Sequence, residues 1–375
     1  MLYVHVPFCH RKCTYCAFFS RAESGKWKVD SYVDALLQEM EERRGEQAHP
    51  IRTVYFGGGT PSLLTVSQLA RIVEGLRRCF DLSQVEEVTL EANPEDLTPQ
   101  YLADLAALRL FNRLSIGVQS LDDGVLRMIG RRHTARQALD AVENARAAGF
   151  GNISVDFIYG LGALASLGGL AWLGMLASLG ISHVSAYALT VEPGTALAVQ
   201  VEQGRVVLPD EDEVVRQYHA MHDLLERNGF RQYEVSNYAR PGLESRHNSR
   251  YWDRTPYLGL GPGAHSFTLP DGGSTSVARG GKRRWNNPDG TWSEETLTEA
   301  DAYNELLMTS LRTTAGLPLA AVPDGQKERL HRQMQPYVDC GWIELSTSNS
   351  PLSTFYRPTA EGLLHADGMA AALFI

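Results

Sequence analysis

The chain has little of what a secreted disulfide protein or a nucleic-acid-binding protein needs. Its 375 residues include only five cysteines, and three of these lie together within residues 9–16. Such clustering is typical of a metal site in a reducing compartment rather than of a disulfide framework. With 35 basic and 44 acidic residues, the net charge of −9 argues against a general nucleic-acid or anionic-membrane surface. No signal peptide precedes the cysteines, so we expect a cytoplasmic protein.

The first half of the chain repeats a strand-then-helix pattern. Apolar, β-rich runs occur at 2–6, 52–56, 86–91, 113–118, 153–158 and 183–189, and helix-like segments occur at 30–44, 65–80, 98–108, 134–148 and 210–228. This alternation predicts parallel strands joined by right-handed crossovers. Distinctive residues follow or end several strands, and in a barrel those ends converge on one face, whereas a flat sheet would spread them along an edge. We therefore predict an α/β fold built on a partial (β/α)6 barrel.

The composition after the barrel predicts two further parts. Residues 1–235 form the predicted barrel, and residues 236–293 are rich in Gly, Pro, Asn, Arg and aromatics, which predicts a loop-rich linker. Residues 294–375 show two helix patterns, two short strand-like pieces and a final helix, as in a small winged-helix-like α+β domain. A DNA-binding winged helix is basic, but this segment has 5 Lys/Arg against 11 Asp/Glu, a net of −6. We expect a structural or lid domain.

One stretch, residues 157–181, contains no charged residue. It is long enough to span a bilayer. Six glycines and the strand patterns on both sides favour a buried helix of the barrel wall instead.

The cysteines are spaced Cys9-x₃-Cys13-x₂-Cys16, directly after the first predicted strand. A structural zinc site takes four ligands, so His5 or His10 would have to complete it. An iron–sulfur cluster held by three thiolates instead leaves one iron open to another molecule. The count of three therefore favours an iron–sulfur cluster, with a zinc protein as the alternative.

This cysteine loop, with Tyr15 before the third cysteine, resembles the signature of the radical S-adenosylmethionine (SAM) superfamily. The resemblance implies that Cys9, Cys13 and Cys16 hold a 4Fe–4S cluster and that SAM chelates the fourth iron. It also implies that an electron from the cluster cleaves SAM to a 5′-deoxyadenosyl radical.

Further motifs are similar, in order and spacing, to the oxygen-independent coproporphyrinogen oxidase group, which includes the HemW-type haem chaperones. These motifs are 3–9 (YVHVPFC), 57–61 (GGGTP), 91–94 (EANP), 113–119 (RLSIGVQ) and 156–161 (DFIYGL). The resemblance implies SAM contacts at Tyr3, Tyr15, Gly58, Gly59, Thr60, Glu91, Gln119, Arg131 and Asp156. Glycines allow close backbone approach, carboxylates accept hydrogen bonds from ribose or an amine, and arginine can pair with a carboxylate. The alternatives are helix-capping carboxylates at Glu91 and Asp156 and a solvated turn at Arg131.

Three features favour the chaperone over the oxidase within this group. Phe18 stands where the oxidases have a further cysteine, and only eight residues precede Cys9, whereas the oxidases have an N-terminal extension. Residues 247–252 (HNSRYW) also match the His-Asn-x-x-Tyr-Trp motif of the chaperones. The match implies that His247 contacts haem, because a neutral imidazole is a natural axial ligand of haem iron. The alternative is a loop histidine bonded to backbone.

Other residues could take part in the same haem site. His265 is a second candidate ligand, and Arg246, Arg250 and the basic loop 279–284 could pair with haem propionates. A solvated surface loop is the alternative for the basic residues.

The resemblance as a whole implies a haem chaperone that carries a 4Fe–4S cluster and SAM, binds haem and delivers it to haem-requiring apoproteins. Peripheral membrane contact and a homodimer are both compatible with that task. The alternative is an oxygen-independent coproporphyrinogen III oxidase, an oxidoreductase that decarboxylates propionates by means of the 5′-deoxyadenosyl radical. Phe18, the short N-terminal segment and the motif at 247–252 favour the chaperone, and the sequence leaves open whether the chain is an enzyme.

Overall fold

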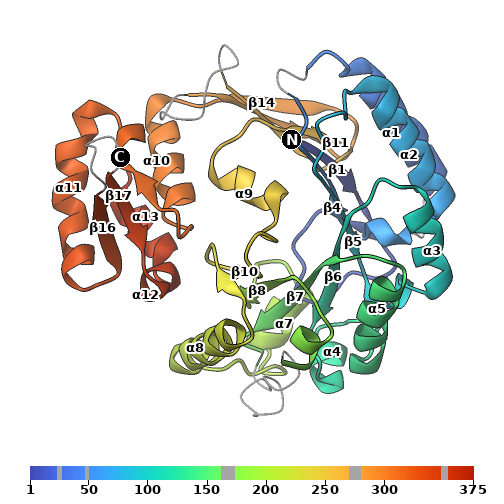
Figure 1. The fold of residues 1–375 in the computed structure, drawn as a ribbon, viewed down its shortest axis with the longest axis horizontal. Helices are drawn as coiled ribbons and strands as arrows, with labels where there is room; N and C mark the ends of the chain where they lie inside the picture. Colours follow the sequence, from blue (N-terminus) through green and yellow to red (C-terminus); the bar gives the residue numbers. More distant parts are fainter. Residues whose placement is uncertain (23–27, 47–49, 162–173, 270–279, 348–353) are drawn as a thin grey trace.

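The computed structural model describes residues 1–22, 28–46, 50–161, 174–269, 280–347 and 354–375. Its main feature is a strongly curved nine-stranded sheet in the order β11-β1-β4-β5-β6-β7-β8-β10-β9 (Figure 1). Six strands of this sheet run parallel in chain order: β1 (Leu2–Val6), β4 (Thr53–Gly58), β5 (Glu87–Ala92), β6 (Arg113–Gln119), β7 (Asn152–Tyr159) and β8 (His183–Ala188). These strands confirm the predicted partial (β/α)6 barrel.

Short strands extend the sheet on both sides of the six. On one side β11 (Leu258–Leu260) runs parallel to β1. On the other side β10 (Asn237–Ala239) and β9 (Arg231–Gln232) run antiparallel to their neighbours beyond β8. A separate two-stranded ribbon, β2 (Phe8–Cys9) with β3 (Arg21–Ala22), frames the cysteine loop.

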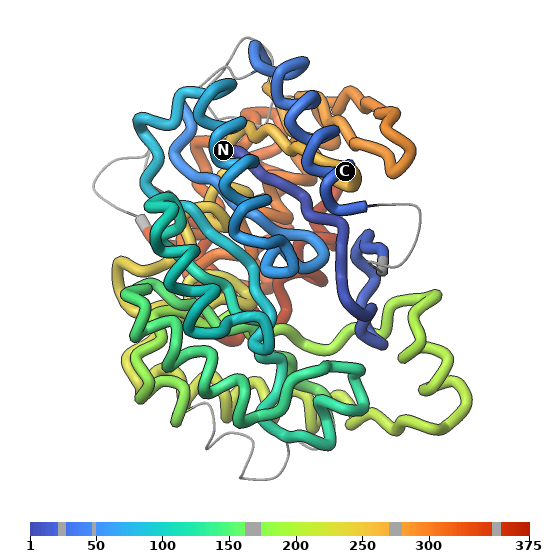
Figure 2. The backbone as a smooth tube through the Cα atoms, turned by 90° about the vertical axis from the view of Figure 1, so that its right-hand side faces the viewer, coloured from blue at the N-terminus to red at the C-terminus, as the bar shows by residue number. Residues whose placement is uncertain are grey.

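Helices cover the outer face of the sheet, as Figure 2 shows for the first half of the chain. The helices of the barrel are α1 (Val29–Glu42), α2 (Val66–Cys79), α3 (Pro99–Ala107), α4 (Asp123–Met128), α5 (Ala135–Ala147), α7 (Ala196–Glu202) and α8 (Glu211–Arg227), with 3₁₀ turns at η1 (Pro61–Leu63) and η2 (Pro94–Asp96). Thr65 and Thr134 begin α2 and α5 with capping boxes, in which the threonine hydroxyl and a glutamine three residues on satisfy free backbone amides. These caps explain why the predicted helices at 65–80 and 134–148 begin and end within one residue of the observed ones.

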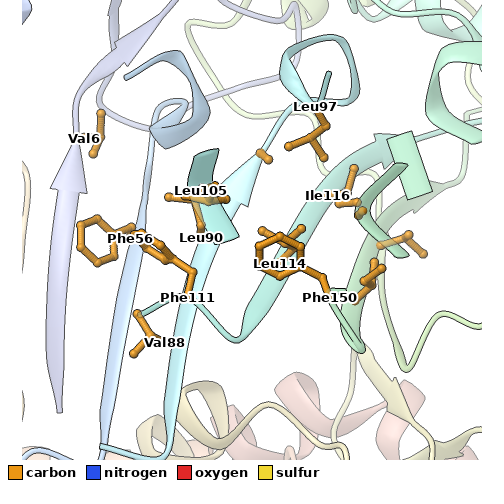
Figure 3. Packing of buried hydrophobic residues seen from close by; sticks show 14 of the residues in the cluster. Val6, Phe56, Val88, Leu90, Leu97, Leu105, Phe111, Leu114, Ile116 and Phe150 are labelled. Atoms are coloured by element: carbon orange, nitrogen blue, oxygen red, sulfur yellow. The ribbon is translucent and has the colours of Figure 1, made fainter. Parts of the chain in front are cut away.

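The barrel strands separate apolar from polar side chains, because successive residues of a strand point to opposite faces. Outward-facing residues form the main hydrophobic core under the helices (Figure 3). In that core Phe56, Leu90 and Leu114 come from adjacent strands, and Leu105 and Phe111 lie against them. The inward-facing side chains of the same strands are largely polar, and we call the space that they line the lumen.

The segment 236–293, predicted to be a loop-rich linker, contains short strands and one short helix between its loops. It contains β10, the helix α9 (Arg246–Trp252), β11, and a three-stranded antiparallel sheet of β12 (His265–Thr268), β13 (Lys282–Asn286) and β14 (Trp292–Thr296). These elements were not predicted individually, because the strands are short and pair with distant partners, so composition and local periodicity carry no signal for them.

The C-terminal part has its own hydrophobic core and fits the predicted winged-helix-like arrangement. It comprises α10 (Glu299–Ser310), β15 (Leu317–Pro318), the 3₁₀ turn η5 (Leu319–Ala321), α11 (Asp324–Asp339), β16 (Ile343–Thr347), β17 (Thr354–Pro358), α12 (Ala360–Leu364) and α13 (Ala366–Leu373). Its strands pair antiparallel in the order β15-β17-β16.

The uncharged stretch 157–181 lies in part outside the described residues. Its start completes β7, and residues 162–173, where the buried wall helix was predicted, are not described. Among the residues that are described, no helix is both long and apolar enough to cross a membrane.

Candidate functional site

The three clustered cysteines lie in the loop that follows β1, at the end of the barrel where the parallel strands finish. Cys9, Cys13 and Cys16 are half-buried free thiols. Thr14 fixes the position of the loop through two hydrogen bonds. Its backbone amide donates to the Ile129 carbonyl at 3.0 Å, and its hydroxyl donates to Met128 O at 3.3 Å. The loop is thus held in place by a segment more than a hundred residues further along the chain.

Two of the thiols already receive hydrogen bonds from side chains. The hydroxyl of Thr60 donates to Cys9 Sγ at 3.5 Å, and Arg131 Nη1 donates to Cys13 Sγ at 3.7 Å. Donors of this kind stabilise thiolates and tune the potential of the metal centre that thiolates bind.

The described residues contain no group of three His, Cys, Asp or Glu side chains that could hold one metal ion. A 4Fe–4S cluster does not require such convergence, because each cysteine binds a different iron of the cluster. The thiols and their two donors therefore fit the donor set of a cluster with one iron left free of protein ligands.

The glycine turn after β4 packs against the cysteine loop. The amide of Gly59 donates to Val6 O at 2.8 Å, and a Cβ at Gly59 would come within 2.5 Å of Phe8 O. Gly58 has φ +108°, and a Cβ there would lie 2.6 Å from the His5 ring. Only glycine permits this backbone conformation and this close approach without strain, which explains the run of glycines before Thr60.

Two inward-facing carboxylates come from β5 and β7. Glu91 accepts hydrogen bonds from the Tyr55 hydroxyl at 2.7 Å and from Gly58 N at 3.2 Å. Burial raises the pKa of Glu91 to about 7, and the charge of Asp156 adds to the shift, while the two hydrogen bonds oppose it. Burial likewise raises the pKa of Asp156, which accepts from Ser115 at 3.2 Å. Both groups line the cavity, and neither caps a helix.

Arg131 joins the cysteine loop to the strand ends. Its Nη2 donates to Asn93 Oδ1 and to the Gly117 carbonyl, both at 2.6 Å. Its Nε is buried and has no hydrogen-bond partner among the described residues. Gln119 lies beside it at the end of β6 with φ +63°, a conformation that is uncommon for a residue with a side chain. Arg131 is therefore not part of a solvated turn, and one of its donors remains available for an acceptor.

These groups surround one cavity of about 630 Å³, a volume within the range of small-molecule sites. Of the predicted residues, the lining contains Cys9, Cys13, Cys16, Tyr15, Gly58, Gly59, Thr60, Glu91, Gln119, Arg131 and Asp156. The structure thus brings eleven of the thirteen predicted site residues to a single cavity.

Tyr3 and His247 are the two that do not line this cavity. Tyr3 lies within the lumen, where its hydroxyl is 3.1 Å from His5 Nδ1 and its ring stacks on Tyr55. His247 is only 1% exposed, and its Nδ1 is 2.8 Å from the Thr53 hydroxyl while its Nε2 is 3.1 Å from the Tyr251 hydroxyl. In this conformation neither ring nitrogen of His247 is available to a haem iron.

The position of His247 follows from that of α9, which lies at the opposite end of the barrel from the cysteines. Thr53 begins β4 and Glu87 begins β5, and the Glu87 carboxylate accepts the backbone amides of both Arg246 and His247 at 2.9 Å. A carboxylate at the first turn of a helix is favourable because free amides point at it. The chaperone-like motif therefore closes the end of the lumen where the strands begin.

Several of the basic residues suggested for haem propionates have acidic partners within the chain. Arg246 pairs with Glu86, and Arg283 pairs with Glu305. Arg284 Nη1 lies 3.5 Å from Glu46 Oε1, and the Arg284 guanidinium lies over the Trp292 ring. Lys282 Nζ lies 2.8 Å from Glu294 Oε1, and Arg279 lies outside the described residues.

Sequence reasoning missed two groups of cavity residues. Asn93 bridges Arg131 and the Thr60 hydroxyl, to which its amide donates at 3.3 Å. It belongs to the 91–94 motif, and this position was the signal that could have identified it. A further set also lines the cavity, and sequence reasoning assigned no SAM contact to any of its members: Arg11, Lys12, Ala17, Phe18, Tyr187 and Leu189.

A curved parallel sheet with three cysteines beyond its first strand, and polar strand-end groups around one cavity, defines the class as a radical SAM barrel. The family model described as the radical SAM superfamily matches residues 3–163. The chain is 36% identical over 345 residues to the heme chaperone HemW of Mycobacterium tuberculosis (strain ATCC 25618 / H37Rv), an alignment that covers 88% of this chain and 85% of that protein. It is 37% identical over 330 residues to the mitochondrial radical S-adenosyl methionine domain-containing protein 1 of Bos taurus. This alignment covers 84% of this chain and 74% of that protein.

Among solved structures, coproporphyrinogen III oxidase (HemN) from Escherichia coli matches with a TM-score of 0.79. The match covers all of this chain and 89% of that chain at 23% identity, so it shows a shared fold. The chain belongs to the HemW family of the radical SAM superfamily. Membership of this superfamily implies a 4Fe–4S cluster and SAM, in agreement with the sequence prediction.

Proposed function

We propose that this protein is a haem chaperone that carries a 4Fe–4S cluster and SAM, binds haem and delivers it to haem-requiring proteins. The observation that carries the proposal is the 36% identity, over most of both chains, to a relative named heme chaperone HemW. The same name belongs to the Lactococcus lactis relative, which is 38% identical over 265 residues. Clustered free thiols suit a reducing compartment, so we place this function in the cytoplasm.

In this proposal Cys9, Cys13 and Cys16 hold the cluster. A cluster held by three thiolates supplies an open iron for the amine and carboxylate of SAM and an electron for SAM cleavage. The free Nε of Arg131 would meet the SAM carboxylate, and Glu91 would accept hydrogen bonds from a hydroxyl or amine of SAM.

The rest of the predicted SAM site follows from the cavity lining. Thr60, Gly58, Gly59, Tyr15, Gln119 and Asp156 line the cavity around those groups. Tyr3 would act indirectly, through its stacking on Tyr55, whose hydroxyl donates to Glu91. We leave His247 outside the haem site because its ring is buried and both of its nitrogens are engaged.

The decisive experiment is anaerobic. Purified protein would be reconstituted with iron and sulfide, and its absorption spectrum, iron content and haem stoichiometry would be measured with and without SAM. We expect a brown protein that binds haem stably. Cys13→Ser should lose the cluster, whereas Cys340→Ser, which removes an exposed thiol of the C-terminal part, should retain it.

The same sample separates the chaperone from the oxidase. Coproporphyrinogen III would be added with SAM and a reductant, and decarboxylated products would be measured by mass spectrometry. Catalytic turnover would overturn the chaperone proposal in favour of the oxidase. A colourless protein that holds stoichiometric zinc would overturn both.

A further inference from the structure

Two exposed aromatic side chains, Phe18 and Tyr187, line the cavity, and we call them the aromatic patch. Phe18 lines the cavity two residues after Cys16 and is 71% exposed. Tyr187, at the end of β8, also lines the cavity and is 43% exposed. Phe18 is a large apolar side chain in water, where its exposure has a cost, and exposed apolar groups beside a polar cavity are typical of a binding surface. The patch therefore suggests a ligand that has a wide apolar face.

Two cations lie beside the patch. Arg11 and Lys12 are exposed, line the same cavity and follow Cys9 in the loop. Lys12 Nζ donates to the Phe18 carbonyl at 3.3 Å, which holds one cation at the backbone of Phe18. Among the described residues no acidic side chain pairs with Arg11 or Lys12, in contrast to Arg246 and Arg283. The two cations are thus available to anionic groups of a ligand.

The inner part of the cavity has the opposite charge. Glu91 and Asp156 face it from the strand ends, and the free Nε of Arg131 there is assigned to the SAM carboxylate, so the carboxylates of a second ligand would be repelled there and attracted at the mouth. The exposed charged residues of the lining are Arg11, Lys12 and Glu192, so two cations stand against one carboxylate at the outer rim. A flat apolar molecule that carries carboxylates on one edge fits this distribution of charge.

We propose that haem docks at the mouth of the cavity, with its macrocycle against Phe18 and Tyr187 and its propionates at Arg11 and Lys12. This inference rests on the proposed haem-chaperone function and locates the haem at the cysteine end of the barrel, away from α9. Haem and SAM would then occupy the outer and inner parts of one cavity. The described lining contains no histidine, so recognition depends on the ring face and the propionates rather than on an imidazole–iron bond.

That distinction gives the first test. Cluster-loaded protein would be titrated anaerobically by calorimetry with haem, with metal-free protoporphyrin IX and with protoporphyrin IX dimethyl ester. A site built on the ring face should bind haem and the free-acid porphyrin with dissociation constants within about threefold. The dimethyl ester lacks the charges that meet the two cations and should bind about tenfold more weakly.

The second test uses matched variants. Phe18→Ala and the double variant Arg11→Ala/Lys12→Ala should each weaken haem binding by about five- to tenfold. Trp292→Ala removes another exposed aromatic ring, 54% exposed on β14, and should bind haem as the wild type does. Arg44→Ala/Arg78→Ala removes the same net charge at the far end of the barrel and should also bind normally. Iron content measured in every variant verifies that the cluster loop is intact.

Each outcome is informative. Wild-type protein that binds no haem would overturn the proposed function and this inference together. Wild-type protein that binds haem while the mouth variants and their controls all bind equally would overturn only the location. Loss of haem binding in His247→Gln with full binding in Phe18→Ala would place the haem at the α9 end, and failure of the metal-free porphyrin to bind would overturn recognition by the ring face.

Discussion

Replacement of His247 separates a structural role from a role as a haem ligand. Its ring lies against those of Tyr55 and Tyr251, with centroids 5.0 and 5.2 Å away, and it bonds to Thr53 and Tyr251. His247→Ala would leave a cavity and two buried hydroxyls without a partner. Truncation of a buried aromatic ring costs about 3–5 kcal/mol, and each lost hydrogen bond contributes about 1 kcal/mol within that range. We expect a comparable loss of unfolding free energy and unchanged haem stoichiometry.

The pH dependence of the unfolding free energy gives a second test of the structural role of His247. Burial lowers the pKa of His247 to about 3 from 6.5, and the positive charges of the N-terminal amine, Arg113 and Arg250 add to the shift. Because the unfolded chain takes up the proton first, this histidine stabilises the fold fully above pH 6.5, and the stabilisation is lost as the pH falls from there toward about 3. The loss at pH 5 amounts to about 2 kcal/mol.

The assay is urea unfolding of cluster-loaded protein, followed by far-UV circular dichroism at pH 7 and pH 5 under anaerobic conditions. His247→Gln keeps a polar side chain that does not titrate, so its unfolding free energy should fall between the two pH values by about 2 kcal/mol less than that of the wild type. Other histidines contribute equally to both proteins and cancel. If His247→Gln keeps the full pH dependence and stability but loses haem, the structural role is wrong and His247 is a ligand.

Three further substitutions test the cavity. In wild-type protein SAM binding, measured by calorimetry, should weaken about fivefold from pH 7 to pH 6 as Glu91 is protonated, and in Glu91→Gln binding should be weak and independent of pH in that range. Gly58→Ala should lower the unfolding free energy by about 2 kcal/mol or more, because the residue has φ +108° and a Cβ would meet a histidine ring, whereas Gly45→Ala, with open space around it, should change little in the same urea titration. Arg131→Lys should lower the reduction potential of the cluster by weakening the hydrogen bond to Cys13, as an anaerobic redox titration followed by electron paramagnetic resonance would show.

The barrel could be predicted from the sequence because its strands and helices carry local signals. Each of the six parallel strands begins and ends within two residues of its predicted bounds, since apolar residues alternate with polar ones and the helices between have capping residues. By contrast β11 has only three residues, and its place beside β1 depends on pairing across more than 250 positions. No local pattern encodes a contact of that kind.

The candidate site likewise has residues that the sequence indicates and residues that only the structure shows. The cysteine spacing, the glycine run and Glu91 each have a physical signature in the sequence, and the barrel brings them together at the strand ends. His247 lies in a recognisable motif, but the sequence does not indicate how deeply its side chain is buried. The residues of α9 would read the same whether the helix faces a ligand or closes the lumen. Phe18 was noted as a missing cysteine, and only the structure shows that it is an exposed ring at the cavity mouth.

Arg113 adds to the difference between the two ends of the lumen, where burial is the largest cause of the pKa shifts of Glu91, Asp156, His183 and His247. It is 1% exposed at the start of β6, and its Nε and Nη1 have no hydrogen-bond partner among the described residues. Its charge opposes the rise in the pKa of Glu91 and Asp156 and lowers the pKa of His183 and His247. One buried cation thus favours anionic carboxylates toward the cysteines and neutral imidazoles toward α9. The cysteine end is therefore the end that suits a cationic sulfonium such as that of SAM, and the α9 end is a neutral, hydrogen-bonded closure.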